Sequence, residues 1–260
     1  DDFEKYNVNT EAVQVESGTN SGVATILVKQ STGERAVFFE RSTATEPEFL
    51  DTHKQLIESA YILHINGRHR QLMCSAMAVA KEVGTIISLD GGAQRYDEDM
   101  KPITEASHIV IVARDYAEKY TGTTNLEDAC RIIHERGAFI AGVTDGANGS
   151  YFVWPDGTSY RCEPFSQATV VDTTGAGDSF HGAFLYMLTK TLCKIADGTN
   201  TSTMNETSQS LNAIDLLHSC AHEDLEKAAT FASAVAALNT QGIGGRSPLP
   251  SLEDIKALIG

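Results

Sequence analysis

A glycine-rich turn followed by an acidic residue opens a helical pattern in the stretch VDTTGAGDSF, residues 171–180. Gly175 and Gly177 allow backbone conformations that other residues disfavour, and they let a ligand approach closely. A helix that begins here directs unpaired N–H groups and the positive end of its dipole at the turn. The stretch therefore predicts an anion site, suited to a phosphate or to an oxyanion in a transition state.

Asp178 stands in this turn, where it would repel a bound phosphate, so anion binding does not explain it. A carboxylate beside a phosphoryl group can act as the general base that removes the proton from an attacking hydroxyl. The stretch then predicts phosphoryl transfer from a nucleotide to an alcohol. The alternative, which the motif alone allows equally well, is that Asp178 caps the helix and that Asp172 and Thr173 only shape a turn.

A second glycine turn, GVTDGANGS at 142–150, follows an apolar strand pattern. Ligands of open α/β sheets gather at the carboxyl ends of strands, so Thr144 and Gly146 can offer a hydroxyl and a backbone N–H to nucleotide phosphates. Taken by itself, the same turn is a common connection of a β-hairpin.

The elements that must position these turns alternate along the chain. Strand patterns occupy 60–67, 85–90, 108–113, 138–145 and 150–154, the last followed by a turn at 155–157. Helix patterns occupy 69–84, 115–122, 125–137, 179–190 and about 223–239. This alternation predicts crossover connections and a mostly parallel sheet covered on both faces, which is an α/β fold.

Two segments depart from the alternation. The strand patterns at 23–30 and 35–41, with a turn at 31–34 between them, predict a hairpin added to the sheet. Residues 196–210 are rich in Ser, Thr and Asn and predict a surface connection between two helices. We therefore expect one domain over 1–260, with a partial β hairpin at about 16–45 and a polar insertion at about 194–212.

Composition excludes several classes of function. The net charge is −15, from 20 basic and 35 acidic residues, and no basic run with aromatics occurs, so nucleic acid is not an expected partner. No apolar run approaches the roughly 18 residues of a membrane span, and the acidic N-terminal residues do not resemble a signal peptide. The 5 cysteines are scattered, without a CxxC pair, which argues against a disulfide framework or a zinc site. We expect a reducing, cytoplasmic compartment.

At this point the chain resembles the PfkB carbohydrate kinases, which have a ribokinase-like fold. DTTGAGDSFHGAFL matches the second signature of that family position for position, and GVTDGANGSYFVWPDG looks like its nucleotide-site turn. FASAVAALNTQGIGGRSPLPSLEDI resembles its closing helix and the loop beside the adenine. HINGRH and HIVIVARDYAEKYTG are most similar to ketohexokinase and fructokinase-like members. The resemblance implies a three-layer α/β/α sandwich with a small β lid.

The resemblance also implies roles for individual residues. Asp178 matches the catalytic base, and the anion hole matches Gly175, Ala176 and Gly177. Positions near ATP match Thr144, Gly146, Gly149, Asn239, Gly242 and Arg68. Asp172 and Thr173 match positions near a monovalent cation, so ATP, Mg²⁺ and K⁺ are the cofactors it implies. We interpret His69 and His181 as ordinary hydrogen-bonded residues rather than ligands.

The chain departs from the family pattern in two places. The family's Asn-x-x-Glu pair, which organises water around Mg²⁺, corresponds here to Ala113 and Tyr116, so the handling of Mg²⁺ is expected to differ. The resemblance also starts inside the family pattern. We therefore expect the family's first strand, first lid strands and sugar-gripping Asp and Asn to be missing from this sequence, which leaves the acceptor sugar unidentified.

The sequence thus predicts an ATP-dependent sugar kinase that acts on a hydroxyl of a fructose-, ketohexose- or ribose-like substrate. Two alternatives stay open: a catalytically impaired, kinase-like binding or scaffold protein, and a nucleoside or vitamin kinase of the same fold. The exposed edge of the opening hairpin also predicts a homodimer through the lid strands.

Overall fold

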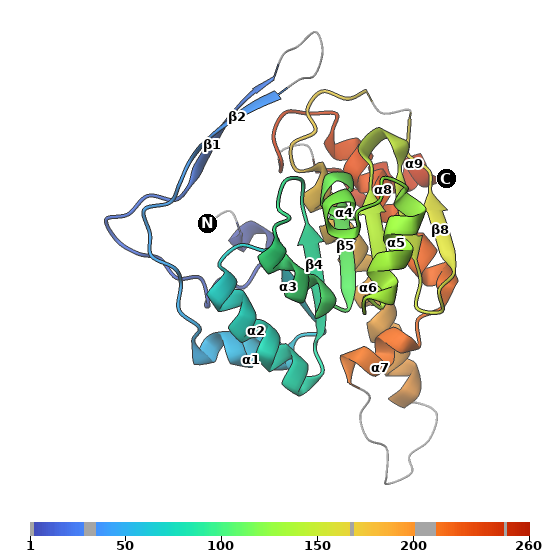
Figure 1. The fold of residues 1–260 in the computed structure, drawn as a ribbon, viewed down its shortest axis with the longest axis horizontal. Helices are drawn as coiled ribbons and strands as arrows, with labels where there is room; N and C mark the ends of the chain where they lie inside the picture. Colours follow the sequence, from blue (N-terminus) through green and yellow to red (C-terminus); the bar gives the residue numbers. More distant parts are fainter. Residues whose placement is uncertain (1–2, 29–34, 167–168, 201–211, 247–248) are drawn as a thin grey trace.

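A six-stranded sheet forms the centre of the protein in the computed structural model, which describes residues 3–28, 35–166, 169–200, 212–246 and 249–260 (Figure 1). The strands lie side by side in chain order: β3 (Ile62–Ile65), β4 (Ile86–Gly91), β5 (Ile109–Ala113), β6 (Ile140–Thr144), β7 (Ser150–Val153) and β8 (Ser159–Cys162). The first four run parallel, whereas β7 and β8 are antiparallel to their neighbours. The carboxyl ends of β3 to β6 therefore meet at one edge of the sheet.

Helices cover both faces of this sheet. One face packs against α1 (Asp51–Ser59), α2 (Arg70–Val83), α3 (Lys101–Glu105), α4 (Arg114–Thr121) and α5 (Leu126–Glu135). The other face packs against α6 (Ala176–Asn200), α7 (Ala213–His218), α8 (His222–Asn239) and α9 (Leu252–Ile259). Short 3-10 helices occur at Glu4–Tyr6, Glu98–Met100 and Gly146–Asn148.

Alternation along the strands divides the core into two layers. On β4, Ile87 and Leu89 belong to the layer of α2 and α4, whereas Ile86 belongs to the layer of α6 and α8. On β5, Val110 and Ile111 divide in the same way. Strands buried on both faces have nearly continuous apolar sequences, as IISL of β4 and IVIV of β5 do.

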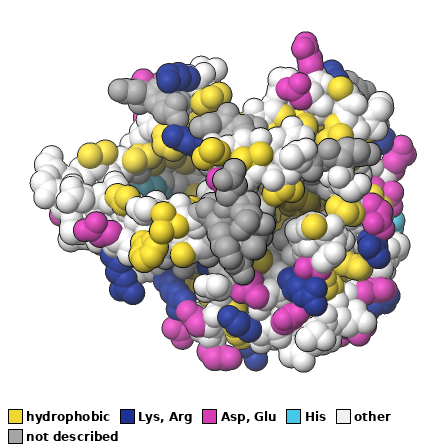
Figure 2. Space-filling view, turned by 90° about the horizontal axis from the view of Figure 1, so that it is seen from above, with side chains coloured by type: hydrophobic (Ala, Val, Ile, Leu, Met, Phe, Trp, Pro, Cys, Tyr) yellow, Lys and Arg dark blue, Asp and Glu magenta, His cyan; other side chains and the backbone are white. Residues whose placement is uncertain are grey.

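The remaining strands form a hairpin of their own, β1 (Val23–Val28) paired antiparallel with β2 (Arg35–Glu40). The hairpin projects beside the body of the protein instead of joining the six-stranded sheet (Figure 1). Hydrophobic side chains gather over it on the left of the upper surface in Figure 2. Phe38 is 61% and Leu27 58% exposed, so the hairpin leaves unusually large apolar groups uncovered.

The predicted three-layer α/β/α fold with a mostly parallel sheet is confirmed. The helix expected at 179–190 is longer, since α6 begins at Ala176 and continues to Asn200, through the first residues of the expected polar connection. Elements that the sequence analysis did not predict are β8, α1, α3, α7 and α9. The expected turn at 31–34 and most of the expected insertion, 201–211, lie outside the described residues. Within the described parts of the chain, no helix has the length and apolar character needed to cross a membrane.

Candidate active site

The glycine turn at 171–178 lies where α6 begins. Gly175 has φ +76°, and a Cβ there would lie 2.5 Å from the Cα of Gly245, so only glycine fits without moving the neighbouring loop. Its carbonyl accepts the N–H of Ser179 at 2.8 Å, which starts the helix. Asp178 stands in the first turn of α6 and is exposed. The predicted base and the predicted anion hole are therefore parts of one local structure.

The second glycine turn connects the antiparallel strands β6 and β7, so the hairpin interpretation of 142–150 describes its backbone. The N–H of Asp145 donates to the carbonyl of Gly149 at 2.9 Å. Gly149 has φ +87°, and a Cβ there would lie 2.3 Å from the carbonyl oxygen of Cys162. The turn also lies at the carboxyl end of β6. The N-terminus of α6 lies at the same edge of the sheet, since Thr144 and Ala176 line one cavity.

A cavity of about 480 Å³ joins the two turns. Its walls include six of the residues predicted to contact ATP, the anion or the cation: Thr144, Gly146, Gly149, Thr173, Ala176 and Gly177. The rest of the lining is largely apolar and includes Phe165, Phe180, Ala236 and Ala237. A mostly apolar cavity with backbone N–H groups at one end is the usual form of a site for a nucleotide-sized ligand.

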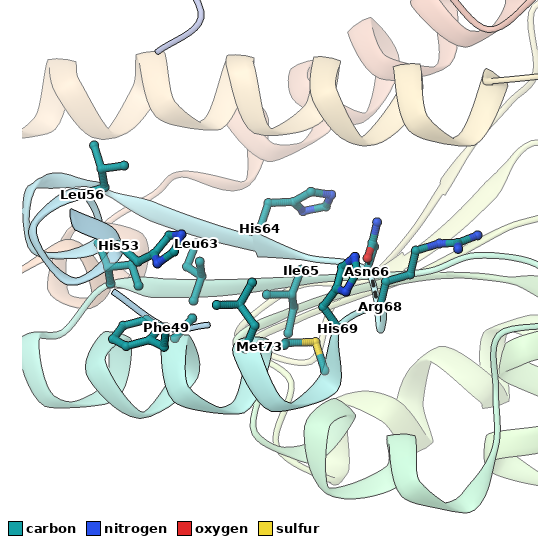
Figure 3. Close-up of a pocket in the computed structure, with 13 residues that line it drawn as sticks. Phe49, His53, Leu56, Leu63, His64, Ile65, Asn66, Arg68, His69 and Met73 are labelled. Atoms are coloured by element: carbon teal, nitrogen blue, oxygen red, sulfur yellow. Dashed lines mark hydrogen bonds between the residues drawn. The ribbon is translucent and has the colours of Figure 1, made fainter. Parts of the chain in front are cut away.

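Six predicted site residues do not line this cavity: Asn239, Gly242, Arg68, Asp172, Gly175 and Asp178, the last of which lines a neighbouring groove with Gly245. Asn239 is fully buried and donates from Nδ2 to the carbonyl of Thr174 at 3.3 Å, so it stabilises the backbone of the glycine turn. Gly242 belongs to the loop after α8. Arg68 lies in a different groove beside β3, where its guanidinium is 5.7 Å from the centre of the Phe39 ring (Figure 3).

Asp172 connects the turn to the loop after α8. Its Oδ1 accepts hydrogen bonds from the backbone N–H of Thr174 at 2.9 Å and from the hydroxyl of Thr174 at 2.7 Å. Its Oδ2 accepts from the N–H of Gly244 at 3.0 Å. Carboxylate oxygens of this kind suit a hard cation. Among the described residues, no cluster of three or more His, Cys, Asp or Glu side chains could hold a metal by itself.

Ala113 and Tyr116, which replace the Asn-x-x-Glu pair, lie in different surroundings. Ala113 ends β5, and Tyr116 is buried in the core, where its hydroxyl lies 2.7 Å from Oγ1 of Thr104. Burial raises the pKa of Tyr116 to about 12, so this phenol stays neutral. Between them, Arg114 pairs with Glu118 at 2.8 Å and with Asp145 at 3.0 Å, which places a cation beside the second glycine turn.

A group of polar residues lies next to Asp178, and of these the sequence analysis named only His181, as an ordinary hydrogen-bonded residue. Asp90 is the next-to-last residue of β4 and is 7% exposed, and its Oδ1 lies 3.3 Å from Nε2 of His181 on α6. Burial works to raise the pKa of Asp90, but the hydrogen bond from His181 and the nearby charges lower it below its usual range. The position of Asp90 at the carboxyl end of a buried parallel strand was the available signal.

His64 completes this group. Its ring centre lies 5.5 Å from that of His181, and its Nδ1 lies 3.3 Å from Oγ of Ser88. Although the residue as a whole is exposed, desolvation of its ring and the neighbouring His181 lower the pKa of His64 to about 4, while Asp90 and Asp178 act in the opposite direction. Figure 3 shows His64 on the opposite side of β3 from Ile65 and Met73.

Comparison with known proteins finds a matching family model and similar proteins. The family model described as pfkB family carbohydrate kinase matches residues 1–252. The protein named "Probable fructokinase-5" of Arabidopsis thaliana is 27% identical over 275 residues, which cover 99% of this chain and 76% of that protein.

Two solved structures have the same fold. The fructokinase of Xylella fastidiosa with bound ATP has a TM-score of 0.76 at 20% identity, over 99% of this chain and 79% of that one. A double mutant of the Vibrio cholerae O395 fructokinase, solved with fructose, ADP and potassium ion, has a TM-score of 0.70 at 18% identity. The match covers 100% of this chain and 79% of that one.

Proposed function

This chain belongs to the pfkB family of carbohydrate kinases, and on that basis we propose that it transfers the γ-phosphoryl group of ATP to a hydroxyl of a fructose-like sugar. The observation that carries the proposal is the position of Asp178. The exposed carboxylate stands in the first turn of α6, and the preceding residues of that turn, Ala176 and Gly177, line the cavity together with the glycine turn after β6.

ATP would occupy the cavity of about 480 Å³. The adenine fits its apolar part beside Ala236, Ala237 and Phe165, and the phosphates run along Thr144 and Gly146 towards the start of α6. A net charge of −15 repels a polyphosphate, so local groups must hold it. The N-terminal N–H groups and dipole of α6 supply that attraction. Arg114, paired with Asp145 at 3.0 Å, lies beside the glycine turn at 142–150.

In the reaction, Asp178 accepts the proton of the attacking hydroxyl as the bond from the sugar oxygen to phosphorus forms. The N–H groups at Gly175–Gly177 stabilise the negative charge on the equatorial oxygens of the transferred group. ADP leaves with the electron pair of the broken bond. Mg²⁺ would neutralise phosphate charge, and the nucleotide and water would chiefly hold it, since Tyr116 is buried in the core. K⁺ is the cation that we assign to Asp172.

The hairpin suggests how the acceptor is enclosed and how copies associate. Phe39 faces the body of the protein, with its ring near Arg68. Successive side chains of a strand alternate in direction, so Phe38 points outward, on the same face as Leu27. We propose that this outward face pairs with the same face of a second copy. We also propose a cytoplasmic location, because Cys130 and Cys162 are buried as free thiols and the fold uses no disulfide between the 5 cysteines.

The decisive experiment is an ADP-release assay of the purified protein with ATP, Mg²⁺ and K⁺ against fructose, ribose and a nucleoside such as inosine. Sugar-dependent turnover that disappears in Asp178→Asn supports the proposal. Turnover with the nucleoside alone would move the acceptor to another class. Tight ATP binding without turnover on any acceptor would favour a kinase-like binding protein.

A further inference from the structure

The interface between α6 and the sheet changes character along its length. At its lower end, α6 places Phe184 and Leu188 against isoleucines of the strands. Near the carboxyl end of β4 the same interface is polar, with residues that all point towards α6 or come from it: His64, Ser88, Asp90 and His181. This polar cluster lies next to the first turn of α6, because His181 follows Asp178 by three residues on that helix.

Asp90 and His181 are the buried members of the cluster. Their side chains are 9% and 5% exposed, and Nε2 of His181 lies 3.3 Å from Oδ1 of Asp90. Nδ1 of His181 is buried without a hydrogen-bond partner in the described structure. An orphaned N–H is rarer and more costly than an orphaned lone pair, so the proton belongs on Nε2 and Nδ1 carries the lone pair. Nε2 of His181 then donates a hydrogen bond to Oδ1 of Asp90.

Stability alone does not account for this arrangement. Replacing a buried ion or polar pair by well-packed apolar side chains is often neutral or stabilising. The surrounding layer is already apolar, since Phe180, Phe184 and Ile111 are all buried there. A buried hydrogen-bonded pair in such a layer instead fixes the orientation of α6, because the bond forms at only one rotation and one depth of the helix on the sheet.

The orientation of α6 matters because Asp178 stands in the first turn of this helix. His181 is three residues after Asp178, so the two side chains lie on neighbouring parts of the same helical surface. Asp90 is the last buried side chain before the loop at the carboxyl end of β4, towards which an acceptor hydroxyl must approach. A bond from Asp90 to His181 therefore sets where the first turn of α6, with its carboxylate and N–H groups, stands relative to the edge of the sheet.

We propose that Asp90 and His181 are positioning residues of the phosphoryl-transfer site. The hydrogen bond from Nε2 of His181 to Asp90 holds the first turn of α6 so that Asp178 and the N–H groups of Gly175–Gly177 meet the acceptor and the phosphoryl group in line. The inference rests on the proposed function. It goes beyond it by assigning a role to two side chains that touch neither ATP nor acceptor.

Three variants test this role. In the double variant Asp90→Leu/His181→Leu the pair becomes apolar, and we expect a thermal midpoint near or above that of the wild type. Its kcat should fall about 10- to 100-fold with an unchanged KM for ATP, because misplacement of the base costs rate rather than nucleotide binding. His181→Gln keeps a donor near the Nε2 position and should recover most of the lost kcat. Tyr116→Phe, which removes a buried hydroxyl on the other face of the sheet, should lower the thermal midpoint with kcat unchanged.

Two outcomes overturn the inference while the proposed function stands: a double variant with wild-type kcat, or a His181→Gln variant as slow as the double variant. Should the double variant not fold, ¹⁵N chemical shifts of the wild-type His181 ring decide, since the inference requires a proton on Nε2, and a ring that carries its proton only on Nδ1 contradicts it. A wild-type protein without sugar-dependent turnover, or an active Asp178→Asn variant, instead contradicts the proposed function.

Discussion

Oδ2 of Asp172 accepts a hydrogen bond from the backbone N–H of Gly244 at 3.0 Å, which joins the loop before α6 to the loop after α8. The same two loops also meet at Gly175, where a Cβ would lie 2.5 Å from the Cα of Gly245. The turn that directs its N–H groups at the cavity is therefore held by a loop 72 residues away in sequence. The anion site depends on both.

Asp178→Asn should lower kcat by about 10²–10⁴-fold, which is the usual contribution of a general base. Nucleotide affinity should stay near that of the wild type, because the substitution removes a negative charge without adding bulk. An ADP-release assay and calorimetric titration with ADP measure the two quantities. An asparagine variant with normal turnover would remove Asp178 from the mechanism.

Gly175→Ala should lower the free energy of unfolding by more than about 1–2 kcal/mol, the cost of a left-handed conformation at a residue with a Cβ, because the methyl group also meets the backbone of Gly245. Gly177→Ala is the matched control, since a Cβ there meets nothing within 4 Å and its φ is not positive. Urea unfolding of both variants tests the difference, and equal stabilities would contradict the described geometry.

Replacing K⁺ by a large organic cation should lower the activity of the wild-type protein if a monovalent cation binds at Asp172. Asp172→Asn retains an oxygen that can accept the bonds from Thr174 but loses the charge, so its activity should respond little to K⁺. Asp172→Ala loses those bonds as well and should also be less stable by about 1.5–3 kcal/mol. A full K⁺ response in the asparagine variant would place the cation elsewhere.

Acid should destabilise the fold through His64, whose pKa is about 4 in the folded protein and 6.5 as its ordinary value. Between these values the unfolded chain binds more protons than the folded one, so the free energy of unfolding falls as pH falls from 6.5 to about 4. The slope stays below about 1.4 kcal/mol per pH unit, the limit for one proton, because solvent reaches part of the ring. His64→Gln should flatten the curve of stability against pH over this range, and an unchanged curve would contradict the assignment.

Phe38→Asp or Leu27→Asp should convert a dimer into a monomer, since both side chains project from the outward face of the hairpin. Phe39→Ser lies on the opposite face and should leave the mass unchanged. Light scattering after size-exclusion chromatography gives the mass directly. A wild-type monomer at micromolar concentration, or a dimer in all three variants, would exclude this interface.

Several elements were missed although their start signals are visible. The helices α7 and α9 begin with capping boxes, Asn212 with Asp215 and Ser251 with Asp254, in which each side chain accepts a hydrogen bond from the partner's backbone N–H. Each helix is short, so its apolar period is hard to recognise beside the longer patterns. The strand β8, with the sequence SYRC, is shorter still and follows the turn at 155–157 that the sequence did predict.

The sequence by itself determined the parallel strands, the helices between them, and the glycine turn with Asp178 at the start of α6. These are local properties, because apolar period, glycine and a following carboxylate all act within a few neighbouring residues. Only the tertiary structure decided that Asp172 would bind the N–H of Gly244, that Tyr116 would be buried, and that Asp90 would meet His181. Such contacts join residues that are distant in sequence, and no local pattern encodes which side chains the sheet order and the packing of α6 bring within hydrogen-bond distance.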